Sequence, residues 1–125
     1  IDLPAWPRYL AYTQRLVERQ QTVAAAVQTL SQPGQPILAI SAAPQIYFLS
    51  QRPPASRWIY LYPVNHTAER EAELARLIEQ RAVPVVVVDD SEPFPWHTRL
   101  RSIIEATCTL HSTPGPNLAI YTCAN

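Results

Sequence analysis

The stretch PVVVVDD at residues 84–90 decides the fold class. Four consecutive β-branched residues disfavour a helix and suit a strand in a sheet that is covered on both faces. Two further runs, ILAI at residues 37–40 and the aromatic WIYLY at residues 58–62, also read as buried strands. Together these runs predict the strands of a mostly parallel sheet.

Helical patterns separate these strands. Residues 8–30 repeat apolar side chains at spacings of three, four and seven, and the Pro-rich segment with Gly34 should end that helix. Further helices are expected over residues 45–49, from the cap residue Thr67 to about Arg81, and along an apolar stripe from Trp96 to Ile104. Alternating strands and helices predict an α/β fold, a three-layer sandwich closed by an antiparallel hairpin near the C-terminus.

The length of 125 residues fits one domain, with an N-terminal helix and linker over residues 1–35 and the strand–helix units and hairpin over residues 36–125. The chain has no Met and starts at Ile1, so we expect a fragment of a longer protein. Ten basic residues balance ten acidic ones, which gives no electrostatic reason to expect nucleic acid as a partner. With only two Gly and no Lys, the sequence excludes a dinucleotide fingerprint, a phosphate loop and a Gly-rich nucleophile elbow.

The two cysteines are placed to face each other in the predicted hairpin. If its turn is centred between Gly115 and Pro116, Cys108 lies opposite Cys123, close enough for a disulfide. The alternative is a pair of unlinked thiols, and the sequence leaves both open. The spacing of Cys108 and His111 is half of a zinc pattern without its other half, so neither a metal nor a cofactor is expected.

Asp89 and Asp90 follow the best strand, at the edge where open α/β sheets place their ligand sites. The pair could bind a cation, or act as nucleophile and acid. The alternative, which we favour, is that one carboxylate caps the loop and the other is solvated.

Aromatic and Arg side chains gather between residues 47 and 60. Tyr47, Arg52, Arg57 and Trp58 form a candidate binding face, since aromatic rings and guanidinium groups can hold a sugar ring, a phosphate or a lipid headgroup. The alternative is that these aromatics enter and leave the sheet as part of the core.

The stretch from residue 37 to residue 62, with APQIYFLSQRPPASRW at residues 43–58, resembles the C-terminal soluble domain of bacterial membrane glycosyltransferases of the GT-C type. These are similar to the dolichyl-phosphate-mannose protein mannosyltransferases. The resemblance implies a lipid-linked sugar donor and an extracytoplasmic active site whose catalytic acidic residue lies in a membrane portion outside this chain. Tyr47, Arg52, Ser56 and Arg57 match a segment whose role in the family is not chemical.

We therefore expect an extracytoplasmic, non-catalytic domain that shapes the acceptor side of such an enzyme. Its partners would be the membrane-embedded part of the same polypeptide and a glycan or lipid-phosphate acceptor. The alternatives are a free-standing α/β enzyme, perhaps a hydrolase using Asp89 and Asp90, or a small-molecule binding module.

Overall fold

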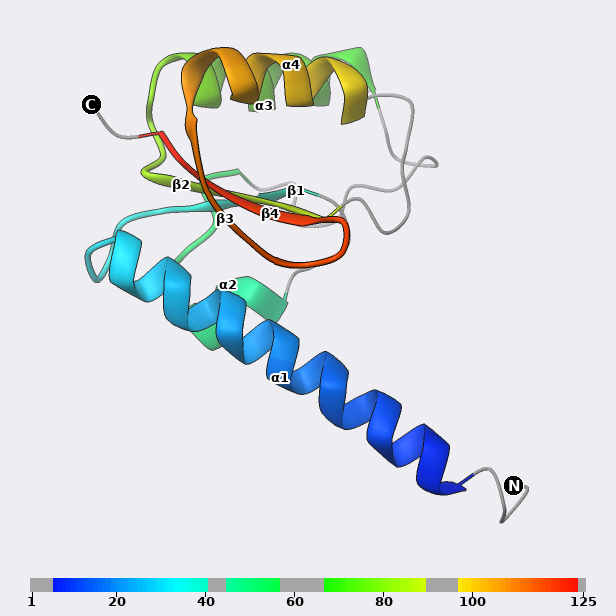
Figure 1. Cartoon of the computed structure of the whole chain (residues 1–125). Coiled ribbons are helices and arrows are strands. Elements are labelled where there is room, and N and C mark those ends of the chain that lie inside the picture. Colours follow the sequence, from blue (N-terminus) through cyan, green and yellow to red (C-terminus); the bar gives the residue numbers. More distant parts are fainter. Residues whose placement is uncertain (1–5, 41–44, 57–66, 90–96, 124–125) are drawn as a thin grey trace.

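The computed structural model describes residues 6–40, 45–56, 67–89 and 97–123. Within these ranges each helix and strand lies close to one that the sequence predicts (Figure 1). In chain order they are α1 (Trp6–Leu30), β1 (Leu38–Ile40), α2 (Gln45–Ser50), α3 (Ala68–Glu79), β2 (Val85–Asp89), α4 (His97–Thr107), β3 (Thr109–Gly115) and β4 (Leu118–Thr122). The predicted strand at residues 58–62 lies outside the described residues.

The described strands form one mixed sheet of four strands in the order β1-β2-β4-β3. β1 and β2 are parallel, whereas β4 is antiparallel to both β2 and β3. The predicted parallel character is thus found only for the β1–β2 pair among the described strands. The reason is that β4 turns back from β3 and pairs with β2, which makes two of the strand pairs antiparallel.

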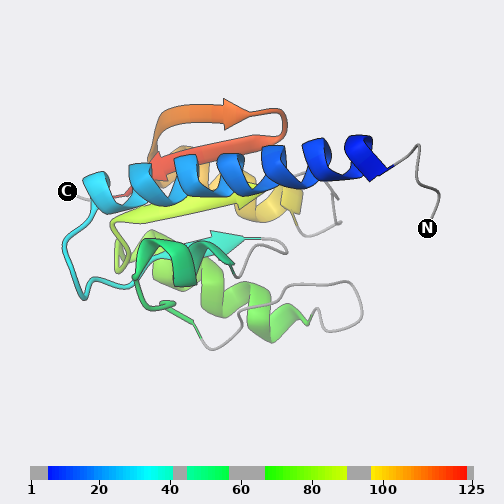
Figure 2. The ribbon, with the colours of Figure 1, turned by 90° about the horizontal axis from the view of Figure 1, so that it is seen from below.

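Helices cover both faces of this sheet, as the run of valines predicts. Val86 and Val88 point into a core with α3 and α4, while Val85 and Val87 point into a core with α1 and α2. All four valines are at most 3% exposed. Figure 1 shows α3 and α4 on one side of the sheet and α1 and α2 on the other; Figure 2 shows α1 lying across β2 and β4.

Capping interactions set both ends of α3. The Thr67 hydroxyl accepts a hydrogen bond from the Arg70 amide at 3.1 Å, as the sequence predicts for the N-cap. The helix ends at Glu79, two residues before the predicted end, because Arg81 adopts a positive φ of 53°. The amides of Arg81 and Ala82 then bond back to the carbonyls of the last turn, at 3.0 Å each.

The hairpin starts in the predicted register and then departs from it. Leu110 pairs with Tyr121 as expected, but Ser112 pairs with Ile120 in place of Ala119. Register irregularities in β3 cause this shift, because each extra residue on one strand moves the pairing by one. At the open end of the hairpin a disulfide joins Cys108 to Cys123, with their Cα atoms 4.3 Å apart.

Candidate functional site

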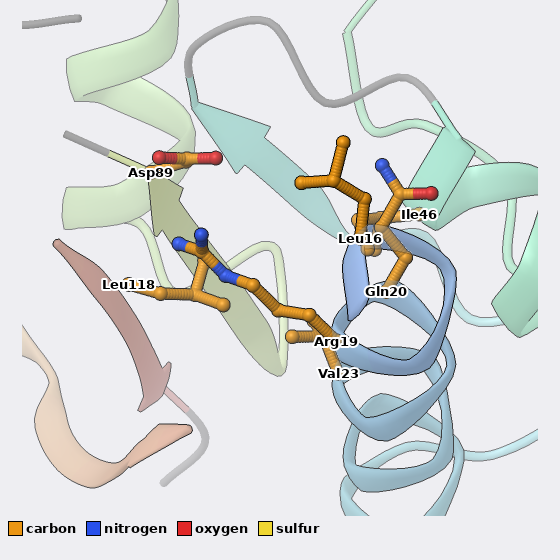
Figure 3. Close-up of a pocket in the computed structure, with 7 residues that line it drawn as sticks. All are labelled: Leu16, Arg19, Gln20, Val23, Ile46, Asp89 and Leu118. Atoms are coloured by element: carbon orange, nitrogen blue, oxygen red, sulfur yellow. The ribbon is translucent and has the colours of Figure 1, made fainter. Parts of the chain in front are cut away.

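A cavity of about 60 Å³ lies at the carboxyl end of β2, between the sheet and α1. Its walls come from α1, α2, β2 and β4, so segments far apart in the sequence meet there (Figure 3). The lining residues are Leu16, Arg19, Gln20, Val23, Ile46, Asp89 and Leu118.

The topology explains why a cavity forms at this edge. α2, which follows β1 in the sequence, lies on the face of the sheet that α1 covers, whereas α4, which follows β2, lies on the opposite face (Figure 1). Connections that diverge from neighbouring parallel strands leave a crevice at the strands' carboxyl ends. Open α/β sheets bind their ligands at such a point, and Asp89 is the last residue of β2.

The base of the cavity is apolar and its polar groups are half-buried. Val23, Ile46 and Leu118 are each at most 6% exposed and belong to the core between the sheet and α1. Arg19 and Asp89 are both partly shielded from solvent. In Figure 3 the Arg19 side chain extends across the cavity toward the side that carries Asp89 and Leu118. The Gln20 amide lies on the other side of the cavity, toward Ile46, so a carboxylate, a guanidinium and an amide line the cavity without meeting at one point (Figure 3).

Arg19 also ties α1 to the hairpin. Its guanidinium donates a hydrogen bond to the carbonyl of Pro116 at 2.8 Å, across 97 positions of sequence. Gly115 permits this approach, because a Cβ at that position would lie 3.1 Å from Arg19 Nε. The absence of a side chain at Gly115 thus leaves room for the Arg19 side chain against the turn.

Tyr47, one of the predicted binding residues, lies on the buried side of α2, against the sheet. Its side chain is 8% exposed, and its hydroxyl accepts a hydrogen bond from the Ala39 amide at 2.8 Å. Burial raises the pKa of the Tyr47 phenol, an effect that the hydrogen bond to Ala39 partly offsets. The hydroxyl therefore satisfies the backbone of β1 and fixes α2 on the sheet.

Arg52 is buried as well and connects the end of α2 to the end of α1. Its Nε donates to the Ser31 hydroxyl at 2.9 Å, and its terminal nitrogens donate to the carbonyls of Ser31 at 3.2 Å and Ser50 at 3.3 Å. A longer bond reaches the Gln28 carbonyl at 3.4 Å. We call this set of hydrogen bonds the Arg52 clamp. It provides partners for carbonyls at helix ends, which have none within their own helices.

The backbone turns Arg52 inward. Gln51 has a positive φ of 56°, and the Arg52 amide bonds back to the Tyr47 carbonyl at 3.3 Å, which closes α2. The structure therefore places Tyr47 and Arg52 in packing and capping roles in place of the exposed binding face predicted for them. Arg57, Trp58 and Asp90, the other predicted binding residues, lie outside the described residues.

Two cavity residues, Arg19 and Gln20, do not stand out in the sequence. Their signal is the helical spacing from Leu16 to Val23, which puts all four residues on neighbouring turns of one side of α1. That spacing predicts a helix, but it does not tell which element α1 meets. Asp89 comes to the same place because α1 lies across β2 and β4 (Figure 2).

No group of three or more potential metal ligands occurs among the residues that the structure describes. In the same residues, no helix has the length and apolar character needed to cross a membrane.

Comparisons of the chain with protein-family models, with curated proteins and with solved structures find no match.

Proposed function

We propose that this chain is a non-catalytic, extracytoplasmic domain of a polytopic membrane glycosyltransferase that uses a lipid-linked sugar donor. The observation that carries the proposal concerns the segment that resembles this family. Tyr47, Arg52 and Ser56 are all at most 8% exposed, and the first two bond to β1 and to the end of α1. These contacts give the segment a structural role, which is consistent with a family in which the same segment takes no part in the chemistry.

The disulfide supports the extracytoplasmic location. Disulfides persist in oxidising compartments and are rare in the reducing cytosol. Cys108 and Cys123 are the only cysteines of the sequence, and they bond to each other. In a membrane glycosyltransferase of this type, the domain would therefore stand on the side of the membrane where the lipid-linked donor is used.

The direction of α1 supports a connection to a membrane-embedded part. The helix is 25 residues long, and its first turns extend beyond the edge of the sheet (Figures 1 and 2). The Arg52 clamp holds its other end. A helix fixed at one end and extended at the other could set the position of this domain over the acceptor side of the active site. The acceptor would be a glycan or a lipid phosphate.

We include in the proposal a three-layer sandwich whose sheet is mostly parallel. A three-layer sandwich with a mostly parallel sheet would need a further parallel strand, for which the sequence offers residues 58–62. The buried faces of β1 support this, since Leu38, Ala39 and Ile40 are each at most 1% exposed.

Two experiments test the proposed function. The full-length reading frame should encode several transmembrane helices before Ile1, and a frame without them would remove the proposal. The 125-residue chain, incubated with lipid-linked sugars, should give neither transfer nor donor hydrolysis above a denatured control. Turnover by this chain would contradict its non-catalytic role and favour a free-standing enzyme.

A second candidate is a small-molecule binding module, and the cavity at Asp89 favours it. An apolar base with a few polar side chains in the walls is typical of ligand sites. The two candidates are compatible, because an accessory domain can also bind part of the acceptor.

A further inference from the structure

We infer that the first half of α1, residues 6–17, binds the headgroup region of an anionic phospholipid bilayer through an apolar stripe on one side of the helix. That this bilayer holds the rest of a glycosyltransferase rests on the proposed function. The class of partner does not, because it follows from the side chains and the charge of α1.

The apolar stripe of α1 is buried along the second half of the helix and exposed before it. Val23 and Val27 are at most 1% exposed, in the core that α1 and α2 share with the sheet. Leu16 lies about two helical turns before Val23 on the same side of α1, yet it is 38% exposed. Val17 has the same spacing from Ala24 and is 45% exposed, whereas Ala24 is 5% exposed. The stripe therefore continues past the surface that covers its second half.

The shape of the domain explains where the cover ends. The second half of α1 lies across β2 and β4, and the first turns extend beyond the edge of the sheet (Figure 2). Leu16 and Arg19 line the cavity at the carboxyl end of β2, so they mark this edge along the helix. A flat lipid surface can therefore reach the first half of α1 without displacing the sheet.

The residue types in the first half of α1 suit a bilayer interface. The sequence WPRYLAYTQRLV at residues 6–17 contains Trp6, and the helical spacing of the stripe continues from Leu16 to Tyr12 and Tyr9. Trp and Tyr are enriched where a membrane meets water, because their rings are apolar and carry one polar group. Helices that lie at this interface combine such an apolar side with basic residues.

The charge of the first half of α1 selects an anionic partner. Residues 6–17 contain Arg8 and Arg15 and no acidic residue. On the opposite face of the sheet, α3 carries four glutamates and two arginines in its sequence AEREAELARLIE. The whole chain has a formal charge of zero, so attraction to anionic headgroups has to come from this uneven distribution. It turns α1 toward the bilayer and α3 away from it.

The same charges disfavour a second copy of the chain as the partner of the stripe. Two copies that pack through residues 6–17 would bring Arg8 and Arg15 of both chains into one interface. That segment has no carboxylate to pair with them, and like charges brought together weaken an interface. Anionic headgroups supply the missing negative charge while the acyl chains bury the apolar side chains.

The test measures how much of the 125-residue chain floats with lipid vesicles in a density gradient. One set of vesicles contains phosphatidylglycerol and phosphatidylcholine in about equal amounts, to give an anionic surface. The other set contains phosphatidylcholine alone. The chain should bind the anionic vesicles and bind the neutral ones about tenfold more weakly, because two arginines lose their attraction to the surface. Added salt should weaken binding to the anionic vesicles only.

Matched variants assign the binding to the stripe. Val17→Gln should weaken binding to both kinds of vesicle about threefold, and Leu16→Gln with Val17→Gln about tenfold, since less apolar surface is buried in the lipid. Leu110→Gln is the control, because Leu110 is 52% exposed and lies on β3, outside α1. Gln favours a helix more than Val does, so Val17→Gln keeps the test decisive even if the double variant does not fold.

A variant of one arginine separates the charge from the apolar contact. Arg15 is exposed on α1, so Arg15→Gln should fold normally. It should weaken binding to the anionic vesicles about fivefold and leave binding to the neutral vesicles unchanged.

Three results would overturn the inference. They are no flotation with anionic vesicles, equal flotation of Val17→Gln and Leu110→Gln, or a dimer in sedimentation velocity that Val17→Gln dissociates. The last result would assign the stripe to a second copy of the chain. None of the three bears on the upstream reading frame, which tests the proposed function. A frame without transmembrane helices, together with vesicle binding, would remove the glycosyltransferase and keep the lipid contact.

Discussion

Replacing Arg52 by Met tests whether the Arg52 clamp holds α1 to the rest of the domain. Met retains much of the aliphatic volume of Arg but makes none of its hydrogen bonds. Three of those bonds are 3.3 Å or shorter, two to Ser31 and one to Ser50. At about 1 kcal/mol of net stabilisation for each bond, the variant should lose about 3 kcal/mol of unfolding free energy. For a domain of this size that loss lowers Tm by roughly 12 °C.

Thermal unfolding by circular dichroism, with urea denaturation alongside, measures the loss. Arg15→Met is the control, because Arg15 is exposed on the same helix and surface changes usually cost less than about 0.5 kcal/mol. Arg52→Lys keeps the charge but cannot reach separate acceptors with a planar fork, so it should recover little of the loss. A melting temperature for Arg52→Met within about 2 °C of that for Arg15→Met would refute the reasoning, since the clamp would then contribute nothing measurable.

Three other contacts give further expectations. Tyr47→Phe should lower the unfolding free energy by about 2 kcal/mol in urea denaturation, because the buried Ala39 amide loses its acceptor at 2.8 Å; an unchanged midpoint would contradict this. Burial raises the pKa of the Tyr47 phenol above its ordinary value of 10.0. Below that pH the phenol is neutral in both the folded and the unfolded chain, and its contribution to the unfolding free energy is complete. As the pH rises further, the unfolded chain ionises first and the unfolding free energy falls. The unaltered chain should therefore lose more stability between about pH 8 and about pH 11 than Tyr47→Phe, and equal losses would place the titration elsewhere. Changing Cys108 and Cys123 together to Ala should cost about 3 kcal/mol, since the disulfide closes a loop across a separation of 15; reduction of the unaltered chain should give a similar loss, and no loss in either case would count against the bond. Thr67→Ala should cost about 1 kcal/mol by calorimetry through loss of the α3 cap, while Thr67→Ser should retain most of it; equal losses in both would show that the hydroxyl is not the cause.

Local patterns in the sequence predict most of the described elements, because local chemistry decides them. The valines of β2 alternate between two cores. Thr67 caps α3 because its hydroxyl accepts a hydrogen bond from the Arg70 amide. In each case the deciding interaction is within a few residues or within one strand. Local patterns do not decide which strands pair. The sequence of the hairpin is compatible with β4 at the edge of the sheet and with β4 between two other strands.

The candidate site was harder to predict, because it depends on which surfaces meet. The aromatic and Arg-rich segment draws attention by its composition, yet the positive φ of Gln51 turns Arg52 onto the end of α1. Arg19 is an ordinary helix residue by sequence, and it becomes part of a site only because α1 lies beside Asp89 and the hairpin. For Asp89 the general rule of α/β sheets indicates a ligand site at the strand end, whereas the sequence pattern favours a capping or solvated carboxylate; the structure places Asp89, half-buried, in the lining of the cavity.

The place of β4 in the sheet constrains when the protein can fold during its synthesis. β4 spans Leu118–Thr122 but lies between β2 and β3, so it supplies the hydrogen-bonding partner for β2 along its whole length. Until residue 122 has left the ribosome, that side of β2 is unpaired. The four valines of β2 then lack the β4 side chains that belong to the two cores. An unpaired apolar strand edge is a template for association with other chains. Chains that stall before Leu118 should therefore aggregate, because they lack the strand that joins β2 to β3.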